Sequence, residues 1–247
     1  MNQRTDPQQL AAVFLTGLAG HPDEFGALAA LWTRGPTLSL SPLYRGDLSI
    51  SAQARHVAEL AEDAGFDRFV AIGHSQGGLV GLELAVTRPD VVAAVAVLDS
   101  PVLVPRPVRI ALRMFVALLH TPVGPALLRL FFRATFVEAD RLEQRAAVMR
   151  RLDRVPRAAA RRIVGAAFGY DAAGALTKVE VPVSYVKANV PTRLDRLPAR
   201  VEGYEVADSG HWVHVHHPHE VGTILGQLAS RVESAVEAND EQSVADA

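Results

Sequence analysis

The residues most able to do chemistry surround Ser75. The chain reads Gly73-His74-Ser75-Gln76-Gly77 between an apolar run and a segment with helical spacing. A serine at a sharp strand-to-helix turn has a strained backbone, and its neighbours two before and two after fit only without a Cβ. The serine oxygen then projects from the end of the strand, where the helix N-terminus favours negative charge. The pattern predicts that Ser75 is a nucleophile, the alternative being a plain glycine-rich turn. His74 is interpreted as a packing residue whose side chain faces away from Ser75.

A serine hydroxyl reacts near neutral pH only when a base removes its proton. Gly210-His211-Trp212 follows the last apolar run of the chain, and the flexible glycine lets a loop place an imidazole over Ser75. We therefore predict that His211 is the general base. The surrounding histidines lack the cysteines and the His-Glu-x-x-His pattern of common metal sites, so neither a metal nor a cofactor is predicted. The histidines interpreted as exposed or helix-start residues are His214, His216, His217 and His219.

The oxyanion of a tetrahedral intermediate needs two backbone donors. The N–H of Gln76 follows the nucleophile directly. The loop after the first apolar run, which contains Thr16-Gly17-Leu18, supplies the second candidate, the N–H of Leu18. The alternative is an ordinary strand-to-helix loop, which would also use these glycines.

Strands and helices alternate along most of the chain, which predicts βαβ units and a parallel, doubly wound sheet. Short apolar runs rich in branched residues are predicted as strands at Ala11–Leu15, Thr37–Leu40, Arg68–Ile72, Val92–Leu98, Pro182–Val186 and Tyr204–Val206. Helical spacing is found at Asp23–Leu31, Ser51–Ala64, Gly77–Thr87 and Glu220–Val236.

One long segment, residues 101–174, contains no convincing strand and is predicted to form a helical cap inserted into an α/β core of residues 8–100 and 175–236. Residues 237–247 are predicted to be a disordered tail. Residues 105–162 carry 13 arginines and four acidic residues. These arginines are either solvated helix faces or a basic rim that steers an anionic substrate. The cap residues expected to line an acyl pocket, or else to pack the cap onto the sheet, are Met114, Phe115, Phe131, Phe132 and Phe136.

Composition narrows the class of protein. The chain has 247 residues, of which 49% are hydrophobic and 21% charged, with a formal net charge of −2. These values are typical of a globular domain and give no reason to expect nucleic-acid binding. The absence of cysteine excludes disulfides, thiolate metal sites and cysteine nucleophiles. The polar start and the interrupted apolar stretch Met114–Phe132 predict neither a signal peptide nor a membrane span, hence a cytoplasmic protein; the oligomeric state is left open.

With these motifs in place, the chain resembles the α/β-hydrolase superfamily from Val13 to about Leu228. It looks closest to small bacterial esterases that carry a Gly-His-Trp-Val-His run, matched here from Gly210 to His214. In that group, the acid of the Ser-His-Asp triad follows the strand that comes after the helix beginning at the nucleophile. Asp99 stands at that position here, and the alternatives are Asp195 and Asp208. Relatives usually have two further strands before the first central one, so about six strands are expected, without that N-terminal hairpin.

The resemblance implies a serine hydrolase that cleaves a carboxylic ester or thioester, a small molecule, through an acyl-enzyme. A lactonase, a C–C bond hydrolase or a cofactor-free haloperoxidase would use the same triad. A dehalogenase or epoxide hydrolase would need an aspartate in place of Ser75. A non-catalytic binding protein with this fold is the alternative from another class, and it would require Asp99 to be merely structural.

Overall fold

The core of the protein is a single sheet of six parallel strands, as the sequence predicts. A computed structural model describes residues 9–138 and 140–245, with side chains up to residue 236. The strand order is β2-β1-β3-β4-β5-β6, and every neighbouring pair is parallel. The strands are β1 (Ala11–Leu15), β2 (Thr37–Leu40), β3 (Phe69–His74), β4 (Val92–Leu98), β5 (Val183–Lys187) and β6 (Val201–Glu205).

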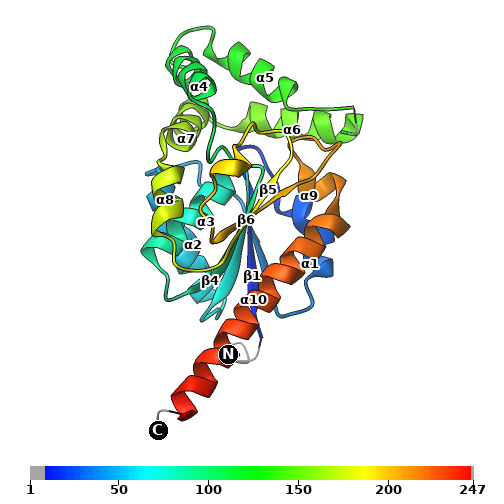
Figure 1. The fold of residues 1–247 in the computed structure, drawn as a ribbon. Coiled ribbons are helices and arrows are strands. Elements are labelled where there is room, and N and C mark those ends of the chain that lie inside the picture. Colours follow the sequence, from blue (N-terminus) through cyan, green and yellow to red (C-terminus); the bar gives the residue numbers. More distant parts are fainter. Residues whose placement is uncertain (1–8, 139, 246–247) are drawn as a thin grey trace.

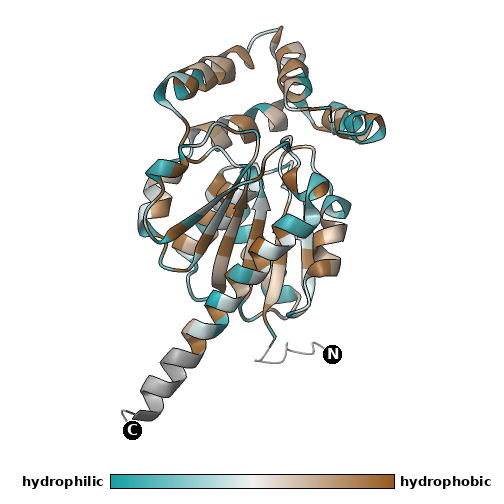
Figure 2. Ribbon diagram, turned by 45° about the vertical axis from the view of Figure 1, so that its right-hand side comes forward, coloured by the Kyte–Doolittle hydropathy of each residue, from teal (hydrophilic) through white to brown (hydrophobic). Residues whose placement is uncertain are grey.

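The central strands are apolar throughout because helices cover both faces of the sheet. Every residue of β1, β3 and β4 is buried. One face packs against α2 (Ile50–Asp63), α3 (Gln76–Thr87) and α8 (Ala172–Lys178). The other packs against η1 (Pro22–Phe25), α1 (Gly26–Leu31) and α10 (Pro218–Ala245). Figure 2 shows hydrophobic residues along the strands and on the surrounding helices.

The elements differ from the sequence predictions mainly at the end of the chain. β6 is Val201–Glu205, whereas Tyr204–Val206 is predicted. It is an edge strand with alternating exposure, so its polar residues hide the apolar signal of a buried strand. Helix α10 continues to Ala245, into the segment 237–247 predicted to be a disordered tail. A formed helix extends at little cost per residue. The side chains of that segment, and all of residues 246–247, lie outside the described residues.

A group of helices between β4 and β5 lies above the carboxyl edge of the sheet (Figure 1). These inserted helices are α4 (Arg106–Leu118), α5 (Gly124–Ala134), α6 (Leu142–Arg154) and α7 (Arg157–Gly169). Their shared core includes Leu128, Phe132 and Val148, and it also contains Ala19 and Trp212 from loops of the sheet. The inserted helices therefore pack directly on the loops that leave the strands. None of the helices in the described ranges is long and apolar enough to cross a bilayer.

The turn between β3 and α3 is possible only because two of its residues are glycines. A Cβ on Gly77 would lie 2.1 Å from the Leu15 carbonyl oxygen, and one on Gly73 would lie 2.2 Å from the Gly77 carbonyl oxygen. Real Cβ atoms do not approach backbone this closely, so both positions must lack a side chain. This observation gives the Gly-x-Ser-x-Gly spacing a physical cause.

Replacing Gly77 by alanine should therefore be strongly destabilising. We expect Gly77→Ala to lower the free energy of unfolding by about 3 kcal/mol, because the backbone of β1 or α3 must shift. Gly81→Ala, in the same helix, is the control, since its Cβ would meet Val95 at an ordinary 3.4 Å. The helix should tolerate that change or gain stability. Urea unfolding of both variants measures the difference, and equal midpoints would contradict this account.

Candidate active site

Ser75 occupies the strained position that the motif predicts. Its φ of 55° and ψ of −120° lie outside the regions that non-glycine residues usually adopt. The conformation is held in place because the Ser75 N–H donates to the Leu98 carbonyl at 2.9 Å and the Ser75 carbonyl accepts from Gly78 N–H at 3.2 Å. Ser75 is thus the residue immediately before α3, at the carboxyl edge of the sheet.

His211 and Asp99 meet at the same edge, although they come from distant parts of the chain. The Nδ1 of His211 lies 2.7 Å from Oδ2 of Asp99. The other carboxylate oxygen of Asp99 accepts from the N–H groups of Ala188 and Val190, both at 2.9 Å. Asp99 is fully buried and has a φ of 44°. Its charge is therefore satisfied entirely by hydrogen bonds, and it fixes Nδ1 of His211 as the protonated nitrogen.

The two alternative acids lie elsewhere. Asp195 is in the short helix η2 (Leu194–Arg196), where it pairs with Arg193 at the surface. That pair lowers the pKa of Asp195, chiefly through the hydrogen bond from Arg193. Asp208 is exposed on the loop after β6. Of the three carboxylates considered from the sequence, the structure brings only Asp99 to His211.

Two backbone donors are available beside Ser75. Within the described residues, the N–H groups of Leu18 and Gln76 have no acceptor. Both residues line the same cavity as Ser75 and His211. A Cβ on the neighbouring Gly17 would lie 3.4 Å from the Ser75 oxygen, so the Leu18 loop passes directly beside the serine. Both N–H groups are therefore available to an acceptor atom in the cavity beside Ser75.

His74 does more than pack, which corrects the interpretation from the sequence. Its Nε2 lies 2.8 Å from the carbonyl oxygen of His211, and its ring lies 4.5 Å from the His211 ring. Burial, followed by the charge of His211, lowers the pKa of His74 well below its ordinary value. The neutral ring donates its N–H to the His211 carbonyl. His74 therefore holds the backbone of the loop that carries His211.

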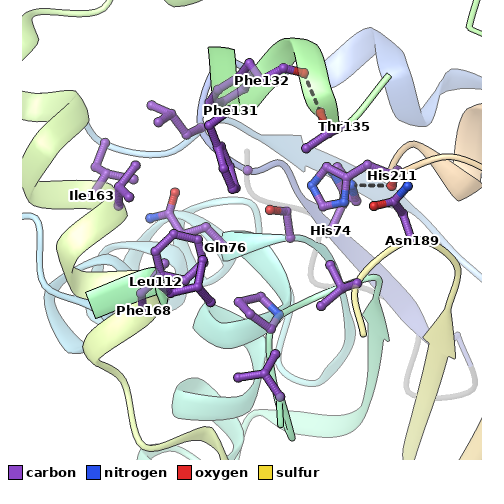
Figure 3. Close-up of a pocket in the computed structure, with 18 of the residues that line it drawn as sticks. His74, Gln76, Leu112, Phe131, Phe132, Thr135, Ile163, Phe168, Asn189 and His211 are labelled. Carbon is purple, nitrogen blue, oxygen red and sulfur yellow. Dashed lines mark hydrogen bonds between the residues drawn. The ribbon is translucent and has the colours of Figure 1, made fainter. Parts of the chain in front are cut away.

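A mostly apolar cavity of about 240 Å³ opens beside these groups. Phe131 and Phe132 line it, as the sequence predicts, together with residues of α4 and α7 that the sequence did not single out (Figure 3). The remaining predicted pocket residues lie elsewhere. Met114 is exposed, Phe115 packs behind Phe131 with ring centres 5.0 Å apart, and Phe136 stacks on Trp212 at 5.0 Å. The additional lining residues labelled in Figure 3 are Leu112, Thr135, Ile163, Phe168 and Asn189.

Comparison with known proteins agrees with this architecture. Residues 12–223 match the alpha/beta hydrolase family. The chain belongs to this family. Among solved structures, an enol-lactonase from Burkholderia xenovorans LB400 is similar to this chain with a TM-score of 0.74. That similarity covers 90% of this chain and 92% of the lactonase at 16% sequence identity, and it shows the fold alone.

Curated relatives are matched over a third of their length or less. An sn-1-specific diacylglycerol lipase from Mus musculus is 35% identical over 102 residues, which is 37% of this chain and 33% of the lipase. A fluoroacetate dehalogenase from a Burkholderia species is 43% identical over 51 residues, 21% of this chain and 17% of the dehalogenase.

The side chain of Gln76 is the least satisfied polar group of this α/β-hydrolase cavity. Gln76 is buried, and neither its amide nitrogen nor its amide oxygen has a partner among the described residues. Figure 3 shows it on the side of Leu112 and Phe168, across the cavity from His211. A buried amide without partners costs free energy unless a ligand or water completes its hydrogen bonds.

A second buried Asp–His pair connects the inserted helices to the His211 loop. Asp140, just before α6, accepts from Nε2 of His216 at 2.8 Å and from Val137 N–H at 2.6 Å. The other ring nitrogen of His216 lies 3.4 Å from the N–H of Gly210, the residue before His211. The side chains of Asp140 and His216 are both buried. Asp140 therefore supports the backbone that positions His211.

The same helix also reaches the Leu18 loop. Arg151 of α6 donates to the carbonyl of Ala19 at 2.8 Å and pairs with Glu24. Ala19 has a φ of 60°, so its conformation needs support of this kind. Burial raises the pKa of Glu24, and the charge of Arg151 opposes that rise. Two contacts, one near each end of α6, thus hold the two loops that flank Ser75.

Sequence reasoning missed these supports for identifiable reasons. His214 and His216 are predicted to be exposed or helix-start residues. Both lie in the short helix α9 (Val213–His216), but their side chains are buried. The dense run of histidines was a signal, although it gave no indication of partners more than 70 residues away in the chain. Asp140 and Arg151 carried no local signal, since each is one charged residue in a charged segment. In the part of the chain that the structure describes, no cluster of three or more His, Cys, Asp or Glu side chains is arranged to hold a metal.

We expect Asp140→Ala to lower the free energy of unfolding by about 3 kcal/mol, because removing one partner of a buried pair leaves His216 without its acceptor. Asp153→Ala is the matched control in the same inserted helices. Asp153 pairs with Arg129 at the surface, where such a pair contributes less than about 1 kcal/mol. Denaturant unfolding measures both variants. A change no larger for Asp140→Ala than for Asp153→Ala would show that the buried pair does not stabilise the protein.

His214 should make stability depend on pH. Its ring stacks on Phe25 at 4.5 Å and lies 4.5 Å from His74, and neither of its nitrogens has a partner within the described residues. Burial, with smaller contributions from His211 and His216, lowers the pKa of His214 to about 3. Because the unfolded histidine has a pKa of about 6.5, the unfolded state binds more protons between these two values. The contribution of the uncharged His214 to the free energy of unfolding is fully present above about pH 6.5 and falls as the pH drops toward 3.

The variant His214→Phe removes this titration while keeping an aromatic ring. We expect the free energy of unfolding to depend less steeply on pH between 6.5 and 4, by up to about 1.4 kcal/mol per pH unit. Some slope should remain, since the pKa of His74 is lowered as well. Urea unfolding at a series of pH values measures the slope. Parallel profiles for the variant and the original protein would rule out His214 as the titrating group.

Proposed function

We propose that this α/β hydrolase is a serine hydrolase that cleaves a carboxylic ester or thioester through a Ser75–His211–Asp99 triad. The observation that carries the proposal is the position of the buried Asp99 carboxylate. It lies 2.7 Å from Nδ1 of His211 while two backbone N–H groups hold its other oxygen. A carboxylate so placed orients the imidazole, fixes its tautomer and stabilises the imidazolium.

The reaction follows from this arrangement. Since Nδ1 carries the proton shared with Asp99, Nε2 of His211 is free to accept the proton of the Ser75 hydroxyl. The serine oxygen attacks the carbonyl carbon, and the N–H groups of Leu18 and Gln76 bind the oxyanion. His211 then protonates the leaving alcohol or thiol. Water attacks the acyl-enzyme with His211 as base, which releases the carboxylic acid and restores Ser75.

The cavity indicates the kind of acyl group. Its lining is mostly aromatic and aliphatic, from the inserted helices, which in this proposal form a cap over the site. Such a lining suits an apolar acyl chain. The unpaired amide of Gln76 would bind one polar atom of the substrate within this apolar lining. A diacylglycerol lipase and an enol-lactonase are among the proteins to which the chain is similar, and both names fit cleavage of an ester bond.

Some alternative reactions would use the same catalytic residues, and others would need a different nucleophile. A lactonase, a C–C bond hydrolase or a cofactor-free haloperoxidase would use the same triad, so they differ from an esterase only in substrate. The dehalogenase relative represents another chemistry, which needs an aspartate nucleophile where this chain has Ser75. A non-catalytic binding protein would have no need of the Asp99–His211 hydrogen bond beside the strained serine.

Labelling with a fluorophosphonate, followed by intact-mass measurement, tests the nucleophile. We expect one adduct on the original protein and none on Ser75→Ala, with hydrolysis of phenyl esters falling by about 10⁶-fold in that variant. Replacing the hydroxyl of the half-buried Ser75 with hydrogen should not disturb the fold, so circular dichroism of both proteins should agree. A folded protein that neither forms the adduct nor hydrolyses a range of phenyl esters would overturn the proposal.

Asp99→Asn tests the acid of the proposed triad in the same phenyl ester assay, with Asp195→Asn as the matched control. We expect ester hydrolysis to fall by about 10⁴-fold in Asp99→Asn, because the amide favours the wrong imidazole tautomer. Asp195→Asn should retain full activity.

A further inference from the structure

Helix α4 exposes an unusual amount of apolar surface. None of its residues is buried. Ile110, Met114 and Leu118 expose 51%, 63% and 45% of their surface. They are four residues apart, so they form one stripe along the helix. A row of large apolar side chains in water usually marks an interaction surface.

The charge beside this stripe is uniformly positive. Arg106, Arg109 and Arg113 are exposed on the same helix, and no acidic residue occurs between Arg106 and Leu118. At 100° per residue, these arginines lie along one edge of the apolar stripe. Within the described residues, none of the three forms an ion pair, whereas Arg129 on α5 pairs with Asp153. Their charges are therefore free to bind an external anion.

The segment that follows α4 also exposes large apolar side chains and an arginine. Val123, just before α5, and Leu130 within it are 57% and 62% exposed. Arg133 on α5 is exposed as well. Figure 1 places α4 and α5 at the end of the molecule opposite the last turns of α10. In Figure 2 hydrophobic residues are visible on these upper helices, outside the core around the sheet.

We propose that α4 docks on the surface of a membrane that contains anionic lipids. A helix with an apolar stripe and flanking cations lies in the plane of a bilayer, with its apolar side chains among the acyl chains. The arginine stems contribute to the apolar contact while the guanidinium groups reach the lipid phosphates, which they bind in a forked geometry. Ile110, Met114 and Leu118 would enter the bilayer, and Arg106, Arg109 and Arg113 would bind the headgroups.

The distribution of charge favours this occupant over a second copy of the chain. Two α4 faces packed together would bring arginines against arginines without an acidic partner in either helix. An anionic bilayer, in contrast, offers negative charge to every exposed arginine of α4 and α5. Binding of α4 to a bilayer does not require a partner protein of complementary shape.

Docking would also bring the cavity to the membrane. The side of α4 opposite the stripe carries Val108 and Leu112, which line the cavity beside Ser75. A lipid ester could then pass from the bilayer to the apolar lining over a short path. This consequence rests on the proposed hydrolase function, whereas the docking itself does not.

Flotation of the full chain with lipid vesicles tests the proposal. Vesicles of phosphatidylcholine alone are compared with vesicles that also contain phosphatidylglycerol. We expect the protein to bind the anionic vesicles at least tenfold more tightly, and added salt to weaken the binding because exposed charges are screened. The Ser75→Ala variant should float equally well, so binding is measured independently of any hydrolysis. Failure to float with anionic vesicles would overturn the proposal whatever the outcome of the labelling experiment.

Two sets of variants assign the surface. We expect the double variant Ile110→Asp/Met114→Asp, and separately Arg109→Glu/Arg113→Glu, to weaken binding tenfold or more. The control is Leu142→Asp, because Leu142 is an 81% exposed leucine of α6, away from α4. All these side chains are exposed, and circular dichroism checks that the variants fold. Equal binding by the α4 variants and the control would overturn the assignment, as would a dimer in sedimentation that Met114→Asp dissociates while vesicles are not bound.

Discussion

The buried carboxylate of Asp99 is the interaction on which the arrangement of the site depends. It accepts hydrogen bonds from two backbone groups after β5 and from the imidazole of His211. A fully buried charge is tolerated only when such donors surround it. Three segments that end or follow different strands must therefore come together correctly around one side chain. The strained φ of Asp99 shows that the backbone adjusts to place this carboxylate.

The inserted helices complete this arrangement from above. Through Asp140 they support the loop of His211, and through Arg151 they support the loop of Leu18. His74 adds a third support from the turn between β3 and α3. Each of these side chains acts on the backbone at or beside Leu18 or His211. The segment between β4 and β5 is thus both the lining of the cavity and part of the framework that fixes its chemistry.

Sequence reasoning predicted the features that depend on local pattern. Alternation of apolar runs and helical segments gave the parallel sheet, and the clash distances at Gly73 and Gly77 explain why the spacing around Ser75 was informative. Long-range contacts were beyond that reasoning. Nothing near Asp140 indicated His216, and Met114 has the same local signal as a lining residue although it faces water. The resemblance to the family placed Asp99, whereas residue spacing alone left three acids open.

The separation in sequence between Asp99 and His211 has a consequence for how the protein acquires its final state. Their hydrogen bond joins residues 112 positions apart, across the inserted helices and the last strands. Contacts between such distant residues close large loops, and folding is slower where these contacts dominate. The pairing of β1 with β3 and of β3 with β4 involves neither of these two residues. Loosening of the C-terminal part would therefore displace His211 from Asp99 first, while Ser75 would still be held by its own turn.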